Sequence, residues 1–496
     1  MSTVGLPLDG HMLPPTRRQF IQRAAGSLAA LCAYPFAARS DNTEAPGPQT
    51  QHIHSFDGAA IQALAAKMDG HLVTPDADDY ETARLIFNRA FDRHPALIIY
   101  CASASDVARG LEFAQRSNVP IAVRSGGHNR AGLSSCDDGV VLDLSRMNQV
   151  TVDVTSRLAR AAGGALVVNL DVATQTVGLA TTSAGCPTVG LAGLTLGGGE
   201  GLLMSKYGAA CDNLVSAQLV TVDGQQIKVS QHSNPELFWA IRGGGGNFGV
   251  VTALEYRLHP LNEVLGGTLL YSAGRIPELL EAFAKFVAAA PDEMNVIGQV
   301  VASAEGPRFQ MQICHCGDTR IGNGLLTSFQ SLKPQHDDIR TMSYLQLNAT
   351  NPAAPAADFQ TNVFLPNLSA AAIEAITTAS TGAPPNTRVF IVPFHGAITR
   401  VGLNDTAFPM RSFGFELDIM GRWADPADRA RAIEWVKGLR DSLQPFAHGA
   451  YVNQLGETGE ELVRTAYGPH YARLAAIKKR YDPKNVLRLN QNIKPA

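Results

Sequence analysis

The chain has 496 residues, of which 45% are hydrophobic and 17% are charged, and its formal net charge is −3. This balance is typical of a soluble globular protein of two or three domains. It lacks the basic surplus expected of a protein that binds nucleic acid or an anionic membrane surface. The 46 glycines gather in clusters, which indicates backbone that turns sharply or approaches a ligand closely.

Residues 1–38 are expected to be a targeting segment outside the fold. Arg17 and Arg18 precede a small, apolar run that reaches about Ala38. This order is typical of a secretory signal of the twin-arginine type, although an amphipathic helix with a chance Arg-Arg pair would look similar. The run is shorter than the roughly 20 residues that span a bilayer, and no later segment is a membrane candidate. A periplasmic or secreted protein is therefore predicted.

Alternating strands and helices are predicted over residues 55–260. "HPALIIYCAS" is predicted to be a buried strand, and the next segment a helix capped by Ser103 or Ser105. "VPIAVRSGGH" and "GVVLDLSRM" are predicted strands, and "NLVSAQLVTVDGQQIKVS" reads as two strands joined by a hairpin turn at Asp223-Gly224. The fold class is therefore α+β.

A change of texture at about residue 261 indicates a second domain. Alanine- and proline-rich linkers separate further strands and helices over residues 261–446. Residues 447–496 are expected to form a strand-like piece, a helix and a polar tail that return to the first domain. "CHC" at Cys314–Cys316 suggests metal ligands, but its neighbours alternate like a strand and no second ligand pair completes a zinc site, so no metal is predicted. The scattered cysteines exclude a disulfide scaffold but allow one bridge.

One glycine loop imitates a dinucleotide-binding motif. "RGGGGNFGVV" contains G-x-G-x-x-G, yet a helical segment precedes it and a strand follows it, which inverts the order of a nicotinamide site. Three glycine clusters, Gly126–Gly127, Gly197–Gly201 and Gly243–Gly249, would instead suit a large planar cofactor that carries phosphates. Purely structural turns are the alternative.

Long motifs in a fixed order resemble one family. They are "VRSGGHN", "GVVLDLSRMN", "GCPTVGLAGLTLGGGEGLLMSKYGAACDNLVSAQLVTVDG", "NPELFWAIRGGGGNFGVVT" and "YDPKNVLRLNQNI". Together they resemble the berberine bridge enzyme-like flavin oxidases of the vanillyl-alcohol oxidase/PCMH group, over nearly all of the chain after residue 38. The resemblance implies a two-subdomain, PCMH-type FAD-binding domain, and a substrate domain with an antiparallel sheet.

The resemblance also implies FAD and two covalent anchors for it. In such enzymes the histidine of R-S-G-G-H is bonded to the flavin 8α-methyl carbon, which maps to His128. In members with two anchors, a cysteine bonded to flavin C6 maps to Cys186. The alternatives are an incidental turn histidine and a small buried thiol.

Further residues are expected around the cofactor. Arg124, Ser125, Gly126, Gly127 and Asn129 would offer backbone amides and one positive charge to the pyrophosphate; Gly198, Gly199, Gly249, Val250 and Val251 would lie against the ring; Val189 would influence O2 access; and Asn490 and Asn492 would help close the site.

A general base is needed on the substrate side, because removal of the hydroxyl proton assists hydride transfer from an alcohol carbon. Period-two alternation in "SFGFELDIMGRW" places Glu416 and Asp418 on one face of a strand, either in a cleft or in solvent. "YVNQL" resembles the family's Y-x-N segment, so Tyr451 is the expected base, assisted by Glu416 or Asp418. A packed core tyrosine is the alternative.

The sequence therefore predicts an exported FAD-dependent oxidase of CH–OH groups that gives H2O2. The partners are a small-molecule substrate and O2, and a mono- or oligosaccharide is the first expectation. Oxidation of a secondary metabolite by an oxidase or a dehydrogenase is the alternative. A binding protein without turnover is disfavoured, because His128, Cys186, Glu416 and Tyr451 occur together. The sequence leaves the oligomeric state open.

Overall fold

The computed structural model describes residues 55–349 and 354–496, so the expected signal segment lies outside the described residues. The first sheet has the order β1-β2-β4-β3, in which β4 pairs in parallel with β2 and β3. Ser103 caps the helix between β2 and β3, as expected, by accepting a hydrogen bond from the Asp106 N–H. The elements are α2 (Gly58–Ala65), β1 (His71–Val73), α3 (Tyr80–Ala83), β2 (Leu97–Tyr100), α4 (Ala104–Arg116), β3 (Ile121–Arg124) and β4 (Val140–Asp143).

The second sheet is antiparallel and has the order β5-β6-β10-β8-β9. The hairpin predicted at Asp223-Gly224 joins β8 to β9, and Gly224 has the positive φ of +81° that such a turn requires. The elements are β5 (Val150–Asp153), β6 (Leu158–Ala162), α5 (Val167–Gln175), β7 (Leu179–Ala180), α6 (Leu191–Leu196), α7 (Met204–Tyr207), η1 (Ala210–Asp212), β8 (Leu214–Val220), β9 (Gln226–Ser230), α8 (Pro235–Ala240), β10 (Val250–Arg257) and β11 (His259–Pro260). Because α8 precedes the glycine loop and β10 follows it, the inverted order expected for this motif is confirmed.

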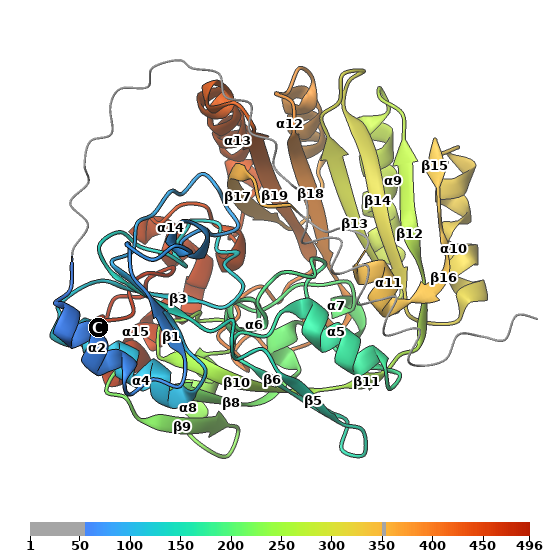
Figure 1. Cartoon of the computed structure of the whole chain (residues 1–496). Coiled ribbons are helices and arrows are strands. Elements are labelled where there is room, and N and C mark those ends of the chain that lie inside the picture. The colour runs from blue at the N-terminus through green and yellow to red at the C-terminus, as the bar shows by residue number, and fades with distance from the viewer. Residues whose placement is uncertain (1–54, 350–353) are drawn as a thin grey trace, which may run out of the picture. The chain divides into compact units, whose positions relative to one another are not determined.

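The third sheet is the large antiparallel sheet of Figure 1, with helices along one of its faces. Its order is β15-β12-β14-β13-β18-β19-β17, and β16 also pairs with β12. The elements are β12 (Glu263–Tyr271), α9 (Ile276–Ala289), β13 (Met294–Val301), β14 (Arg308–His315), α10 (Thr319–Ser331), β15 (His336–Asp337), β16 (Arg340–Ser343), α11 (Tyr344–Asn348), β17 (Ala357–Leu365), α12 (Ala370–Ser380), β18 (Thr387–Phe394), η2 (Gly396–Thr399), β19 (Gly414–Trp423), η3 (Pro426–Asp428), α13 (Arg429–Leu443) and η4 (Gln444–Phe446).

The two faces of this sheet have opposite character. Val389, Ile391, Leu417 and Ile419 share one apolar core with the inner faces of α9, α12 and α13. The intervening residues of the same strands include the charged side chains of Arg388, Glu416, Asp418 and Arg422 beside apolar ones, and several of them line a cavity. Strand alternation therefore makes one face a core and the other face a wall of that cavity.

The last 50 residues differ in part from the sequence prediction. The segment after Tyr451 is a short 3-10 helix, so the predicted strand-like piece is wrong. Its Asn453 side chain instead donates a hydrogen bond to the Leu194 carbonyl, which attaches the turn to α6. The remaining elements are η5 (Val452–Gln454), α14 (Glu460–Tyr467), η6 (Gly468–His470) and α15 (Tyr471–Tyr481).

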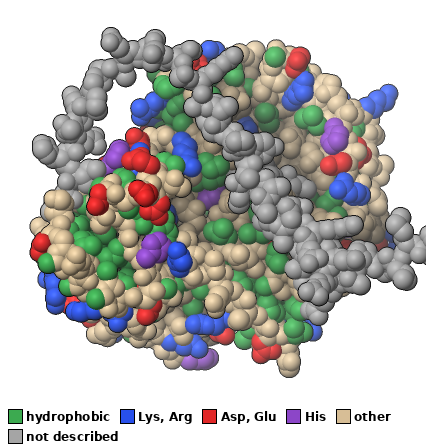
Figure 2. Space-filling view, in the orientation of Figure 1, with side chains coloured by type: hydrophobic (Ala, Val, Ile, Leu, Met, Phe, Trp, Pro, Cys, Tyr) green, Lys and Arg blue, Asp and Glu red, His purple; other side chains and the backbone are tan. Residues whose placement is uncertain are grey.

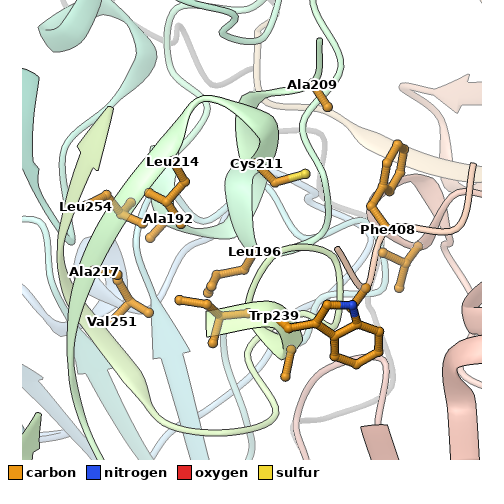
Figure 3. Packing of buried hydrophobic residues seen from close by; sticks show 14 of the residues in the cluster. Ala192, Leu196, Ala209, Cys211, Leu214, Ala217, Trp239, Val251, Leu254 and Phe408 are labelled. Atoms are coloured by element: carbon orange, nitrogen blue, oxygen red, sulfur yellow. The ribbon is translucent and has the colours of Figure 1, made fainter. Parts of the chain in front are cut away.

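A large buried apolar cluster includes residues of α6 and α8, and Figure 3 shows part of it. Ala192 and Leu196 of α6 belong to it, as do Trp239 of α8 and Phe408, which precedes β19. The Trp239 indole N–H also donates to the Asn404 carbonyl at 2.9 Å. This core therefore joins residues far apart in the sequence. Some of them precede β12 in the chain, and others follow β18.

Three further observations concern the cysteines, the helices and the surface charges. Among the described residues the six cysteines are free, so the optional disulfide does not form there. No described helix is both long and apolar enough to cross a bilayer. Among the described side chains on the face in Figure 2, acidic and basic groups are interspersed.

A buried ion pair anchors the glycine loop before β10. Lys478 Nζ donates to Asp482 at 2.6 Å and to the carbonyls of Asn247 and Leu487 at 2.8 and 2.9 Å. Both charged side chains are fully buried. Asn247 lies within the Gly243–Gly249 cluster, so Lys478 holds this loop against the C-terminal segment.

Lys478→Met is predicted to destabilise the protein by roughly 3–5 kcal/mol, because it leaves Asp482 buried without its counter-charge. Denaturant unfolding followed by circular dichroism would measure this loss. Lys479→Met, at the exposed neighbouring position of α15, is the control and should change stability by less than about 0.5 kcal/mol. Equal effects of the two substitutions would contradict the anchoring role.

Candidate active site

The described residues enclose one large cavity of about 590 Å³. Its walls come from the loop after β3, the loops around α6, the loop before β10 and the C-terminal segment. A further wall is the polar face of the large sheet, through residues of β13, β14, β18 and β19. The cavity thus joins the predicted cofactor segments to the predicted substrate segments.

The loop after β3 contributes its backbone to the cavity. Ser125, Gly126, Gly127 and Asn129 all line it, as the sequence predicts. A Cβ on Gly126 would meet the Gly190 nitrogen at 2.3 Å, so two loops approach here more closely than a side chain allows. The Asn129 carboxamide oxygen accepts from the N–H groups of Ala131 and Leu133, which holds the end of the loop.

The expectation for the Arg124 side chain is wrong. Its guanidinium forms a buried ion pair with Asp143 and donates to the carbonyls of Ala83 and Leu85. Arg124 does not line the cavity. The Arg124 side chain therefore links β3 to β4 and to the segment at the end of α3. Its charge is not directed at a pyrophosphate.

His128 and Cys186 meet at one hydroxyl group. Thr188 Oγ1 lies 3.0 Å from His128 Nε2 and 3.5 Å from Cys186 Sγ, and both predicted anchors line the cavity. The His128 ring stacks on Phe87 with a centroid distance of 3.8 Å. Burial, and then the charge of Arg130, lower the pKa of His128 to about 3. The imidazole is therefore neutral at pH 7, and one of its nitrogens keeps a free lone pair.

Three glycines leave room for a bulky ligand. A Cβ built on Gly185, Gly193 or Gly246 would meet nothing within 4 Å, and all three residues line the cavity. Side chains there would enter the cavity itself. A smooth backbone wall of this kind suits a broad planar ring, so the residues present fit the FAD that the sequence predicts.

The other predicted cofactor residues divide into two groups. Val189, Gly249, Val250, Val251 and Asn490 line the cavity. Gly198, Gly199 and Asn492 are not among its lining residues, so ring contact by the two glycines and closure of the site by Asn492 stay predictions. The positive φ angles of Gly198 and Gly199 serve protein packing, because a Cβ would collide with Phe408 and Ala210 respectively.

Buried carboxyl groups gather on the sheet side. Glu416 and Asp418 of β19 are 0% and 4% exposed, so a solvated outer face is wrong for them. Asp418 lines the cavity, together with Glu200 from the loop after α6, which sequence reasoning missed. Neither carboxyl oxygen of Glu416 receives a hydrogen bond from a donor among the described residues.

This burial shifts the acidity of all three groups. Burial raises the pKa of Glu200 to about 8 and that of Asp418 to about 7, while the charge of Arg130 opposes the shift at Asp418. Burial and the charge of Glu200 raise the pKa of Glu416 well above its usual value. Near neutral pH the group therefore holds protons that exposed carboxylates would have lost.

Tyr451 lies beside these carboxyl groups and also lines the cavity. Its hydroxyl oxygen accepts hydrogen bonds from the Gly199 N–H at 2.9 Å and from the Asn453 amide at 2.7 Å. Burial, and then the charge of Glu200, raise the pKa of Tyr451 well above its usual value. Tyr451 therefore stays a neutral phenol whose own O–H can donate to a third group.

The structure adds polar residues that sequence reasoning missed. Arg388 on β18 and Arg422 on β19 line the cavity, as does Arg130 after β3. Gln299 and Gln312 bring carboxamides from β13 and β14. Alternation could have revealed Arg422, because it has the same parity as Asp418 on β19.

Comparisons with known proteins identify the family. Residues 95–230 match the FAD binding domain family, and residues 450–494 match the family described as berberine and berberine like. An uncharacterized FAD-linked oxidoreductase of Bacillus subtilis is 30% identical over 458 residues, which cover 86% of this chain and 98% of that protein. The (R)-6-hydroxynicotine oxidase of Paenarthrobacter nicotinovorans is 32% identical, with coverages of 87% and 98%.

Solved structures share the fold. The crystal structure of 6-hydroxy-D-nicotine oxidase from Arthrobacter nicotinovorans matches with a TM-score of 0.80 at 29% identity, covering 86% of this chain and 98% of that one. Xylooligosaccharide oxidase from Myceliophthora thermophila matches with a TM-score of 0.79 at 21% identity, covering 88% and 99%, which shows a common fold.

Gly193→Leu is predicted to abolish FAD binding without unfolding the protein, because its side chain would enter the cavity from α6. The ratio of flavin to protein after purification, together with the melting temperature, measures both parts. Gly438→Leu on α13 is the matched control, since it is also a helical glycine with free space around its Cβ. Full flavin content in Gly193→Leu would contradict the assigned ring position.

Proposed function

The chain belongs to the berberine bridge enzyme-like family of FAD-linked oxidoreductases, and we propose that it is an oxidase of a small alcohol. In the proposed reaction the alcohol carbon loses a hydride, the hydroxyl proton passes to the protein, and a carbonyl forms. The two electrons finally reduce O2 to H2O2. The observation that carries this proposal is Asp418, a buried carboxyl group on the wall of the cavity that also holds both expected flavin anchors.

FAD supplies the hydride acceptor when it is bound. The chain would hold the ring along Gly185, Gly193 and Gly246, and the pyrophosphate at the backbone of Gly126 and Gly127. We further propose that His128 and Cys186 each form a covalent bond to the flavin. Their shared contact with Thr188 supports this, because two bonds to one edge of a ring require two neighbouring side chains.

We assign proton removal to Asp418 and not to Tyr451. A base must be unprotonated near the working pH, and Asp418, with a pKa of about 7, meets this condition while Tyr451 does not. Tyr451 would instead donate its O–H to a substrate oxygen, since two N–H donors already occupy its lone pairs. Glu416 does not line the cavity and acts as a positioning residue behind Glu200.

A mono- or oligosaccharide remains the first candidate for the substrate of this enzyme. The carboxamides of Gln299 and Gln312 on the cavity wall can both donate to and accept from sugar hydroxyls. The 32% identity to (R)-6-hydroxynicotine oxidase favours a secondary metabolite as the second candidate. Three arginines on the same cavity, Arg130, Arg388 and Arg422, disfavour a cationic alkaloid, because their positive charges would repel it.

We also propose that O2 reaches the ring past Val189 and that the protein is exported. Val189 lines the cavity, and we propose that its small apolar side chain leaves O2 access to the ring. A dehydrogenase would differ by being reduced by substrate without forming peroxide in air. Export through a twin-arginine signal at residues 1–38 would allow FAD to be loaded before transport.

The two proposed anchors predict a specific release pattern. Acid precipitation should free no flavin from the wild type, from His128→Ala or from Cys186→Ala, because one bond is enough to retain it. The double variant should release all its flavin. Fluorescence of the denatured protein on a gel measures the retained fraction, and Cys136→Ala, a buried thiol off the cavity, is the control. Release from the wild type would refute covalent attachment.

The carboxyl group on the wall predicts a pH profile. Because the pKa values of Asp418 and Glu200 are raised to about 7 and about 8, kcat/KM should be low in acid and rise through this range as the base loses its proton. Asp418→Asn should lower kcat by roughly 10²–10⁴-fold. Steady-state peroxide formation measures both effects.

Glu374→Gln is the control for this substitution, since it removes an exposed carboxylate from α12 and should leave kcat unchanged. An Asp418→Asn enzyme with wild-type kcat would assign the proton elsewhere. A wild-type profile that falls between pH 6 and 8 would have the wrong sign for a carboxylate base.

A further inference from the structure

Three arginines lie close together on the cavity wall, and the negative charge around them does not balance their positive charge. Arg388 of β18 faces Met420 of β19 across the strand pair, which makes Arg422 its diagonal neighbour. Arg130 reaches the same region from the loop after β3. Its Nη1 and the Arg422 Nε each lie 3.8 Å from one Asp358 oxygen, which is longer than a hydrogen bond.

These guanidinium groups keep unused donors. Arg130 Nη1, Arg388 Nε and Arg422 Nε are buried and have no hydrogen-bond partner among the described residues. Arg388 makes no ion pair within the described chain, and burial and then the charge of Arg422 lower its pKa. Arg124 shows the contrast, because its guanidinium is neutralised by Asp143 and also donates to two carbonyls.

Buried N–H groups without an acceptor destabilise the protein when no ligand is bound, and so does the repulsion between neighbouring side chains of the same charge. The cost is offset when a ligand brings acceptor oxygens and negative charge, which arginine forks bind in carboxylates and phosphates. The three arginines line a cavity of about 590 Å³, so a ligand in the cavity can lie against their guanidinium groups.

The location favours the substrate over the pyrophosphate of FAD. Arg388 and Arg422 rise from the large sheet on the face that also carries Phe390, Asp418 and Met420. The pyrophosphate is expected at the Gly126–Gly127 turn. Arg422 lines the same cavity as Cys186, the expected anchor of the ring.

We propose that the substrate carries an anionic group, the carboxylate of a uronic acid or a phosphate ester, which Arg388, Arg422 and Arg130 bind while Asp418 faces the alcohol to be oxidised. This rests on the proposed oxidase function and narrows its substrate to an acidic saccharide. Arg388 is level with Met420, two residues from Asp418, and Arg422 is four residues away. At about 3.4 Å per residue these steps are about 7 and 14 Å, the span of one to two sugar rings.

The test measures binding separately from turnover. Holoenzyme is mixed rapidly and without O2, at constant ionic strength, with D-glucuronate, digalacturonate, D-glucose 6-phosphate, D-glucose or galactobiose, and the change in the flavin absorption spectrum that precedes flavin reduction is recorded as a function of sugar concentration. At least one acidic sugar should bind at least about 10-fold more tightly than its neutral counterpart. The uronate and phosphate arms identify which anion the site takes.

Arg388→Gln should weaken binding of that acidic sugar by about 10-fold or more and leave binding of the neutral sugars unchanged. Arg388→Lys should restore part of the affinity. Arg340→Gln, an exposed arginine of β16 on the same sheet, is the matched control. The melting temperature of Arg388→Gln should not fall, because the substitution removes repulsion from Arg422.

The inference is overturned if no acidic sugar binds, if neutral sugars bind equally well, or if Arg388→Gln keeps full affinity for the anion. The proposed function fails separately. Anion binding without peroxide from any sugar would refute the oxidase and leave the anion site. Peroxide from neutral sugars with the same kcat/KM as from acidic ones would leave the oxidase and refute the anion site.

Discussion

Strand alternation in the eight-stranded sheet is the constraint on which the site depends. Leu417 and Ile419 must face the helices to complete the apolar core, so Glu416, Asp418, Met420 and Arg422 must face the other way. A shift of β19 by one residue would bury the charged set in the core and expose the apolar set. The packing energy of the core therefore holds the chemical groups of β19 in position, although none of them contributes to that core.

The site is electrostatically unusual, because it brings a set of buried carboxyl groups close to a set of arginines. Glu200, Glu416 and Asp418 are carboxyl groups whose burial favours the protonated form. Farther along the same strands, Arg388 and Arg422 each keep a buried N–H group that no described residue accepts. Arg130 connects the two sets, since its charge lowers the pKa of Asp418 against the effect of burial. The proposed proton acceptor and the proposed anion-binding arginines thus line one cavity, an arrangement that would orient a substrate with two distinct ends.

Sequence reasoning succeeded where a local signal was sufficient. Ser103, the Asp223-Gly224 turn and the order around Gly243–Gly249 depend on neighbours in the chain, and the structure has them as predicted. Arg124 was assigned wrongly because its partner Asp143 lies on another strand, and no local pattern reveals that pair. Glu200 was missed for a similar reason, since only the tertiary fold brings the loop after α6 to β19. Gly198 and Gly199 carried the right signal for close approach, but what approaches them is Phe408 and Ala210.

The central claim is that flavin lies between the glycine loops and the polar face of the large sheet. A crystal structure of the flavin-loaded protein tests it most directly. We expect continuous electron density from the ring to His128 and Cys186, with Asp418, Arg388 and Tyr451 facing the ring across the space left for substrate. A ring bound away from Gly185, Gly193 and Gly246, or a sheet whose Asp418 and Arg388 face away from the ring, would contradict it.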